Sequence, residues 1–233
     1  MLVFVPLFLV SVISSWGVAE DNDGIPPRLS ERFIFPRSAD SSEFPSLKLL
    51  RTALAGYEML IEDQSISRPE VITIIDFSLP SDKERFWVLD LIHRKVLFRC
   101  LVSHGRNSGE LMAENFSNNP GSNASSPGFY STGETYIGKH GLSLALDGLE
   151  MGINDKARTR AIVIHGADYV SADFIRNNGR LGRSLGCPAV PVELSKEIIQ
   201  TIKGGSCLFI YVPKASYTSN SQIISKITSI TKI

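Results

Sequence analysis

After Pro69 the chain consists of short apolar runs separated by turn-forming residues, and this pattern most restricts what it can fold into. The runs are rich in β-branched, aromatic and aliphatic residues, whereas Gly, Asn and Ser dominate the connections. Runs of this length and composition predict strands. We expect strands at residues 71–77, 86–91, 95–102, 134–137, 142–146, 160–164 and 206–212, with a hairpin turn at 92–95.

Three other segments predict helices. Residues 47–62 carry apolar side chains at steps of three and four, which align on one side of an α-helix. Residues 192–203 form a second candidate, with Pro191 near the first turn, and residues 171–177 a short third one. The chain has no repeat of solenoid period, no dinucleotide-binding glycine fingerprint and no P-loop. We therefore predict a β-rich α+β domain over residues 69–213.

The composition excludes two broad classes of protein. With 43% hydrophobic and 21% charged residues among 233, the chain is not expected to be disordered as a whole. Its 24 basic and 24 acidic residues give a net charge of zero. Because general attraction to phosphate needs a basic excess, we expect no nucleic-acid partner.

The amino-terminal end predicts export. Residues 2–13 are almost entirely apolar, and Gly17 to Ala19 resemble a signal-peptidase site, so residues 1–19 are expected to be a signal peptide. The apolar run is too short for a bilayer span, and we expect no permanent membrane anchor. Residues 20–68 are interpreted as a linker plus the first helix, and residues 214–233 as a flexible tail. The expected location is the bacterial periplasm or cell envelope.

The three cysteines are too few for a disulfide scaffold and lack the spacing of zinc ligands, so no metal is expected. Cys100 and Cys207 lie in apolar strand patterns and are expected to be buried. After export they could form a disulfide if they meet, which the sequence leaves open. Cys187 differs from both because Gly, Ser, Arg and Pro surround it.

A histidine and this cysteine make the strongest candidate for chemistry. His165 and Gly166 end a predicted strand, and Cys187 lies in a glycine-rich loop after 21 intervening residues. A thiol with a pKa near ~8.5 is mostly protonated at neutral pH. An imidazole can take its proton or, as imidazolium, stabilise the thiolate. The backbone N–H groups of Gly186 and Cys187 are expected to stabilise an oxyanion, and Pro188 to hold the thiol in direction.

These residues also carry a family resemblance. His165-Gly166 followed by Ser184-x-Gly186-Cys187 resembles the L,D-transpeptidase catalytic-domain (YkuD-like) family, and the string GRLGRSLGCPAV resembles its murein L,D-transpeptidase branch. Further similar stretches extend the resemblance over roughly residues 70–213. It implies a mixed β-sheet with a few short helices.

Residue by residue, the resemblance implies that Cys187 is the nucleophile and His165 the general base. The Gly166 carbonyl would orient that histidine, while Ser184 and Gly186 match the family's Ser-His-Gly-Cys element. Leu185 stands where the family has a second histidine. No arginine follows the cysteine closely, and Arg183 could supply the missing charge.

The implied reaction is acyl transfer without a cofactor. Cys187 would attack the carbonyl of the L-to-D bond of a peptidoglycan tetrapeptide stem, release D-alanine and form a thioester, which an amine of a second stem would resolve. Arg180 and Arg183 are the candidates for binding a stem carboxylate, and Tyr130 and His104 for lining the groove. His104, which precedes a glycine at a strand edge, could instead order the loop or serve only the turn. Alternatively, Arg183 pairs with a carboxylate of the protein itself.

Two other functions remain open from the sequence. With water as the resolving nucleophile, the same Cys/His pair gives an L,D-carboxypeptidase or another cysteine peptidase. A catalytically silent cell-wall-binding domain would bind the same material without turnover. The oligomeric state is left open.

Overall fold

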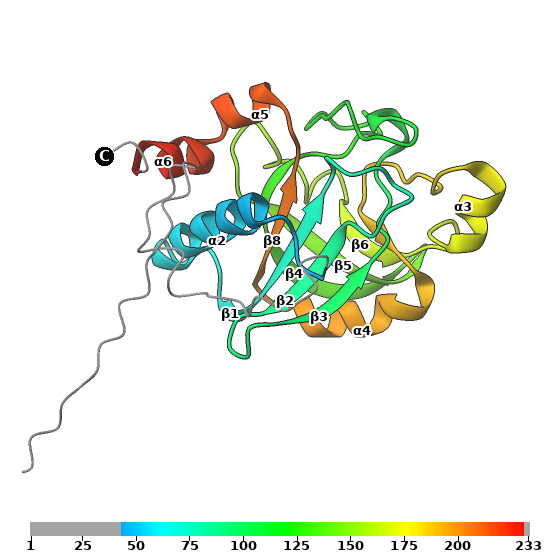
Figure 1. The fold of residues 1–233 in the computed structure, drawn as a ribbon, viewed down its shortest axis with the longest axis horizontal. Helices are drawn as coiled ribbons and strands as arrows, with labels where there is room; N and C mark the ends of the chain where they lie inside the picture. The colour runs from blue at the N-terminus through cyan, green and yellow to red at the C-terminus, as the bar shows by residue number, and fades with distance from the viewer. Residues whose placement is uncertain (1–42, 231–233) are drawn as a thin grey trace, which may run out of the picture.

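One mixed sheet of eight strands organises the fold (Figure 1). The computed structural model describes residues 43–230. In the strand order β3-β2-β1-β8-β4-β5-β6-β7, the pairs β1–β8 and β6–β7 are parallel and the other neighbours are antiparallel. The strands are β1 (Arg68–Asp76), β2 (Phe86–Asp90), β3 (Lys95–Cys100), β4 (Gly128–Gly138), β5 (Gly141–Gly148), β6 (Val163–Gly166), β7 (Ala189–Val190) and β8 (Ser206–Tyr211). The predicted β-rich α+β class is confirmed.

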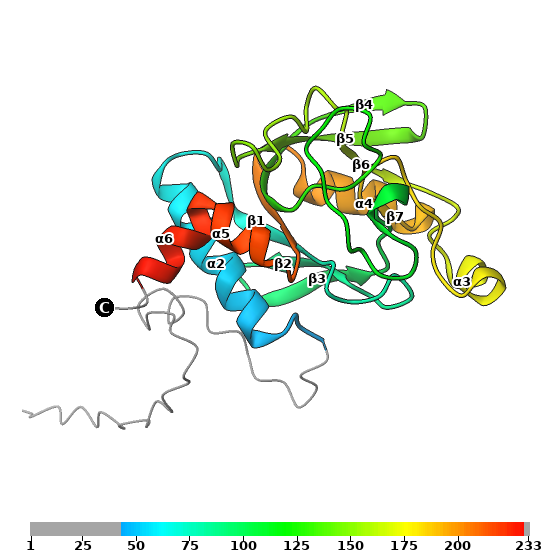
Figure 2. The same ribbon diagram turned by 90° about the horizontal axis from the view of Figure 1, so that it is seen from above.

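Within residues 43–230, five α-helices and one short 3-10 helix accompany this sheet. They are α2 (Leu47–Glu62), η2 (Arg106–Ser108), α3 (Ala172–Asn178), α4 (Val192–Ile202), α5 (Ala215–Asn220) and α6 (Gln222–Ile230). Seen from above, α2, α5 and α6 lie together near β1, and α4 lies apart from them (Figure 2). Helix α4 packs against β5 and β6 and buries Ile198, Ile199 and Ile202. The helix predicted at residues 47–62 is confirmed.

Local side-chain chemistry sets the helix ends. The Ser46 hydroxyl accepts a hydrogen bond from the N–H of Leu49 at 3.4 Å, and the Ser171 hydroxyl accepts one from Phe174 at 3.2 Å. Each bond satisfies an N–H that the first turn leaves unpaired. Gly179, with φ of 71°, ends α3 in the left-handed conformation that glycine adopts readily.

The predicted flexible tail at residues 214–233 is wrong for its described part. Helices α5 and α6 occupy it, and α6 packs against α2 with Ile223, Ile224 and Ile227 buried. The buried carboxylate of Glu150 fixes α5, because the Tyr217 hydroxyl donates to it at 3.0 Å and the Ser221 hydroxyl also donates. Scattered isoleucines in a Ser/Thr-rich segment thus form an apolar face once α2 is beside them.

Helix α2 also belongs to the main core. Its side chains Leu49, Leu50, Ala53 and Leu54 join the same apolar cluster as strands β1 and β8. The sequence interpretation had placed this helix with a linker that ended at residue 68. The structure instead packs it against the sheet, since its apolar face needs a partner to leave water.

The strand predicted at residues 160–164 begins later than expected. Residues 151–161 form turns, and the N–H of Ile162 donates to the carbonyl of Ala157 at 3.0 Å. Ala161 has φ of 53°, which is uncommon for a residue with a side chain. Strand β6 therefore starts at Val163 and carries His165 within it instead of at its end.

Cys100 and Cys207 are both buried and free, and they do not meet. Cys100 ends β3 and Cys207 lies in β8, with β2 and β1 between them. Three strand spacings alone separate them by at least about 14 Å, whereas a disulfide needs Cα atoms within roughly 7 Å. The two thiols cannot form an intramolecular disulfide in this fold.

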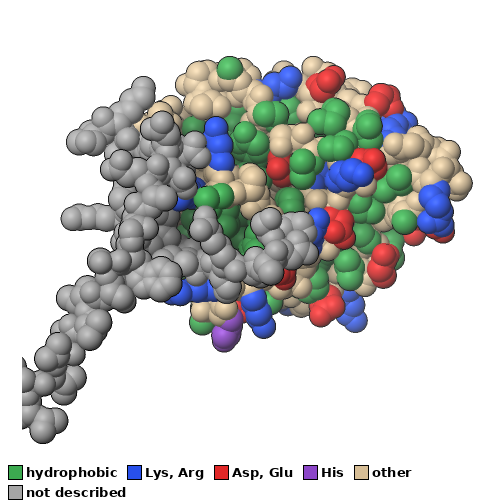
Figure 3. Space-filling view, in the orientation of Figure 1, with side chains coloured by type: hydrophobic (Ala, Val, Ile, Leu, Met, Phe, Trp, Pro, Cys, Tyr) green, Lys and Arg blue, Asp and Glu red, His purple; other side chains and the backbone are tan. Residues whose placement is uncertain are grey.

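The expected signal peptide and the linker up to residue 42 lie outside the described residues. Among helices within 43–230, none combines the length and apolar character that a bilayer crossing requires. Basic and acidic side chains are interspersed over the described part of the face in Figure 3, with hydrophobic side chains between them. That visible part carries no broad region of a single charge.

Candidate active site

The pairing of β6 with β7 brings the predicted histidine and cysteine segments together. The two strands run parallel, with His165 opposite Ala189 and Gly166 opposite Val190. Two residues back along both segments, the N–H of Val163 donates to the Cys187 sulfur at 3.4 Å. The thiol and the imidazole therefore lie on adjacent segments, since Cys187 is two residues before Ala189, the residue that pairs with His165.

The Cys187 side chain is half-buried, and its surroundings favour the protonated thiol. Burial raises the pKa of the Cys187 thiol, against the Val163 N–H and the positive charge of Arg160, which lower it. The S–H group faces the carbonyl of Ala161 at 3.7 Å. In the described part of the chain, no hydrogen bond joins this thiol to the His165 ring. The thiol therefore needs a base to take its proton if it is to attack.

The His165 ring is arranged to serve as that base. The Gly166 carbonyl accepts a hydrogen bond from His165 Nδ1 at 2.9 Å, which leaves Nε2 to accept a proton. Burial lowers the pKa of His165, the hydrogen bond to Gly166 raises it in part, and the nearby His140 lowers it. The ring is thus neutral at pH 7. The Gly166 main chain lies where the resemblance implied that it would.

Ser184 ties the cysteine loop together through its hydroxyl. This group donates to the Cys187 carbonyl at 2.6 Å and accepts from the Gly186 N–H at 3.0 Å. The expectation that Gly186 supplies an oxyanion donor is wrong for this structure, because its N–H already has a partner. The N–H of Cys187 lies against its own sulfur and is the donor left for a developing oxyanion.

Two glycines allow the loops around the cysteine to meet. Gly186 has φ of 127°, and a Cβ there would lie 3.0 Å from the Ala124 carbonyl. A Cβ on Gly105 would lie 2.9 Å from the Gly186 Cα. The Ser125 hydroxyl joins the two, accepting from the Gly105 N–H at 3.0 Å and donating to the Gly186 carbonyl at 3.1 Å. Side chains at either glycine would push the cysteine loop away.

Arg160 is a site residue that the sequence did not indicate. Its guanidinium donates to the Ser117 carbonyl at 2.7 Å and to the Ala124 carbonyl at 2.6 Å, and it also reaches the hydroxyls of Ser122 and Ser126. It therefore holds the loop of residues 117–126 beside the cysteine. Its charge acts on Cys187, whereas the family's arginine after the cysteine has no counterpart here.

We expect Arg160→Met to slow alkylation of Cys187 at pH 7.5 on the order of tenfold. Loss of the positive charge raises the thiol pKa, so less thiolate is present. The rate of iodoacetamide addition against pH measures this. Arg158→Met is the matched control, since Arg158 lies in the same turn but pairs with Asp147 and Glu134. Equal rates in both variants would show that the Arg160 charge does not reach the thiol.

The two arginines predicted to bind a stem carboxylate bind a carboxylate of the protein instead. Arg180 Nε lies 2.8 Å from one oxygen of Glu110, and Arg183 Nη1 lies 2.6 Å from the other. Arg183 also donates to the Arg106 and Gly109 carbonyls at 3.2 and 3.1 Å. Arg183 therefore pairs with a carboxylate of the protein itself, as the second hypothesis for this residue expected.

Truncation of Arg183 tests whether this residue binds substrate or only pairs with Glu110. We expect Arg183→Ala to leave KM and kcat for a peptide donor within about twofold, because the side chain is occupied by Glu110 and two carbonyls. Steady-state kinetics on wild type and variant check this. A severalfold rise in KM with unchanged kcat would show that Arg183 leaves Glu110 to bind substrate.

His104 and Tyr130 do not line a groove, and their assignment to substrate binding is wrong. His104 is 1% exposed, and Arg85 Nη2 donates to its Nδ1 at 2.7 Å. Burial and the Arg85 charge lower the His104 pKa to about 4. Tyr130 is 0% exposed and donates to the Ser126 carbonyl at 3.0 Å. Both stabilise the framework. The His104 carbonyl stabilises the cysteine loop directly, because it accepts a hydrogen bond from the Ser184 N–H.

Tyr169 is a second residue that sequence reasoning missed. Burial raises the pKa of its phenol to about 12, and a thiolate at Cys187 would raise it further, so the hydroxyl is protonated at neutral pH. Nothing in the local sequence distinguishes Tyr169 or Arg160 from other residues of their types. Over residues 43–230 no group of three or more His, Cys, Asp or Glu side chains is arranged to hold a metal.

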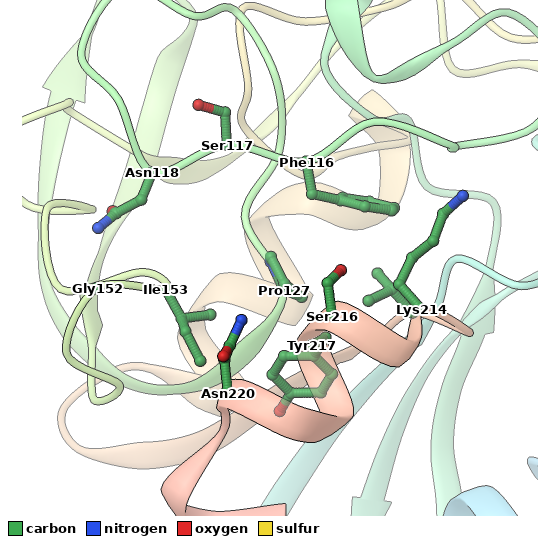
Figure 4. Close-up of a pocket in the computed structure, with 11 residues that line it drawn as sticks. Phe116, Ser117, Asn118, Pro127, Gly152, Ile153, Lys214, Ser216, Tyr217 and Asn220 are labelled. Carbon is green, nitrogen blue, oxygen red and sulfur yellow. The ribbon is translucent and has the colours of Figure 1, made fainter.

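A separate pocket of about 190 Å³ lies between α5 and two loops (Figure 4). Phe116, Pro127 and Ile153 form its apolar wall, and Ser216 and Asn220 reach it from α5. None of the predicted site residues lines this pocket. Ser117 links it to the cysteine site, because its carbonyl accepts a hydrogen bond from Arg160.

Comparison with known proteins finds a matching family model and matching solved structures. Residues 42–211 match a family model described as L,D-transpeptidase catalytic domain, a range that includes α2. A search of the curated proteins finds no match. An L,D-transpeptidase structure from Mycobacterium smegmatis shares 12% identity, with 61% of this chain and 59% of that chain covered and a TM-score of 0.39. The helical cell shape determining protein Pgp2 from Campylobacter jejuni shares 14%, with 68% and 52% covered and a TM-score of 0.42. The chain thus spans about three fifths or less of these structures.

Proposed function

Since the chain belongs to the L,D-transpeptidase catalytic domain family, we propose that it is an exported acyltransferase that acts on peptidoglycan stem peptides through a Cys187 thioester. One observation carries the assignment of the chemistry. The neutral His165 ring, fixed by the Gly166 carbonyl, lies on the strand that pairs with the Cys187 segment. The apolar run at residues 2–13 supports export to the periplasm or cell envelope.

The first step forms the thioester. His165 Nε2 takes the thiol proton while the sulfur attacks the carbonyl of the L-to-D peptide bond, and the Cys187 N–H stabilises the oxyanion. When the oxyanion collapses, the C–N bond breaks. The imidazolium returns the proton to the leaving amine of D-alanine. The stem remains bound to sulfur as a thioester.

The second step transfers the acyl group. An amine of another stem gives its proton to His165 and attacks the thioester, and the sulfur leaves as a thiolate that the imidazolium reprotonates. Atoms balance without a cofactor or oxidant. Water in place of the amine would give a carboxypeptidase, which the experiment below distinguishes.

The two shifted pKa values support the general-base route. Burial raises the pKa of Cys187 and lowers that of His165, so the resting pair is thiol and neutral imidazole. A thiolate–imidazolium pair would need the opposite shifts. The proton therefore moves during attack and not before it.

The test is incubation of the purified protein with disaccharide-tetrapeptide, followed by intact mass, with Cys187→Ala in parallel. The proposal expects a transient acyl adduct on wild type only and release of D-alanine. A crosslinked product with an amine acceptor identifies a transpeptidase, and a tripeptide alone a carboxypeptidase. A folded protein with a free thiol that gives neither adduct nor turnover would contradict the proposal and favour a silent binding domain.

A further inference from the structure

The imidazole of His140 lies flat against that of His165. The ring centroids are 4.5 Å apart and the ring planes differ by 20°. His140 is exposed to solvent, whereas His165 is 2% exposed. One face of the His165 ring is thus covered by a side chain that comes from the surface.

A tight hairpin delivers His140 to this position. Strands β4 and β5 pair up to Gly138 and Gly141, so Lys139 and His140 form a two-residue turn. Gly141, the residue after this turn, has φ of 78°, a left-handed conformation that glycine adopts readily. In the next strand pair, Ser143 lies opposite His165. Because Gly141 is only two residues from Ser143, the turn ends beside β6.

Stacking has two physical consequences for His165. A covering ring removes water from one face and restricts rotation of the imidazole about its χ angles, and packed aromatic rings are favourable at this separation. Two stacked imidazoles also resist carrying two positive charges at once. Both effects favour a fixed, neutral His165 ring.

The other groups near His165 do not provide this cover. From the cysteine loop, the Cys187 thiol is the titratable group at the neighbouring position. Helix α4 packs against β6 and turns the uncharged Ser195 toward Gly166. His140 is the one side chain in the described residues that stacks on the His165 ring.

We propose that His140 is a positioning residue that covers the His165 ring and keeps it fixed and neutral for proton transfer. The catalytic consequence rests on the proposed function, but the contact itself does not. A first test therefore needs no substrate.

That test follows the ring protons of His165 by NMR against pH in the full chain. We expect His140→Ala to remove the upfield ring-current shift and to raise the titration midpoint of His165 by about half a pH unit. His140→Phe keeps a ring, so it keeps the upfield shift and raises the midpoint less. His93→Ala is the matched control, since His93 is exposed in the β2–β3 turn and pairs with Asp90 at 2.8 Å. Identical spectra and midpoints for wild type and His140→Ala would overturn the proposal.

A second test uses turnover on disaccharide-tetrapeptide. His140→Ala should lower kcat/KM about five- to tenfold and move the acid limb of its pH profile upward, while His140→Phe should recover most of the rate. An unchanged acid limb in His140→Ala would overturn the positioning role. If wild type itself has no turnover, the proposed function fails while the NMR result still decides the contact.

Discussion

Replacing Cys187 by alanine is expected to lower acyl transfer by at least about a thousandfold, because the variant has no atom that can form the thioester. Backbone donors and substrate binding remain, so the variant should still bind the stem peptide. Release of D-alanine under single-turnover conditions measures the loss, and intact mass should show no adduct. Since Cys187 is half-buried in a loop held by Ser184, a methyl group there leaves the loop bonds in place.

Cys187→Ser is the companion variant. Serine has nearly the same side-chain shape as cysteine and carries a hydroxyl. That hydroxyl is a far weaker nucleophile than a thiol beside a single imidazole. We expect it to be nearly as inactive as the alanine variant, with an unchanged melting temperature. Turnover of the alanine variant within tenfold of wild type would exclude Cys187 as the nucleophile, and Cys100 and Cys207 are too deeply buried to replace it.

Substitution of His165 by glutamine should lower kcat/KM by about a hundred- to ten-thousandfold. Glutamine is uncharged and similar in size, but it cannot take the thiol proton. With a raised Cys187 pKa, the thiolate that remains at pH 7 is scarce. The variant's rate should therefore rise with pH as the thiol ionises by itself, whereas wild type reaches its plateau once His165 is neutral.

The pH profile separates loss of the base from damage to the fold. His93→Gln is the control, because it removes an exposed histidine from a hairpin remote in sequence from the site. It should leave the profile of wild type unchanged. A His165→Gln variant that keeps the wild-type rate at pH 7 would show that another group removes the thiol proton.

Local pattern predicted most elements because their signals are local. The helix at residues 47–62 needs only its own three- and four-residue spacing, and the strands near β2, β3 and β8 need only short apolar runs. Strand β6 starts at Val163, three residues later than predicted. Ala161 adopts φ of 53° because the turn before it closes through the Ala157 carbonyl.

The fold brings together the segments of the two residues predicted to react, whereas several residues predicted to surround them have other partners. Cys187 and His165 carry chemistry in their side chains and stand in a distinctive glycine-rich context. Arginines at 160, 180 and 183 are chemically identical in the sequence. Only the fold turns Arg160 toward the cysteine loop and the other two toward Glu110.

The sequence alone therefore determined the α+β class, most element positions, the thiol and imidazole pair, and the family resemblance. Tertiary structure decided what partners each group has: the carboxy-terminal helices on α2, the distance between Cys100 and Cys207, the burial of His104 and Tyr130, and the stacking of His140 on His165. Periodicity and residue chemistry act over a few neighbouring residues. Burial, charge pairing and pKa depend on residues far away in the chain, which only the folded sheet brings together.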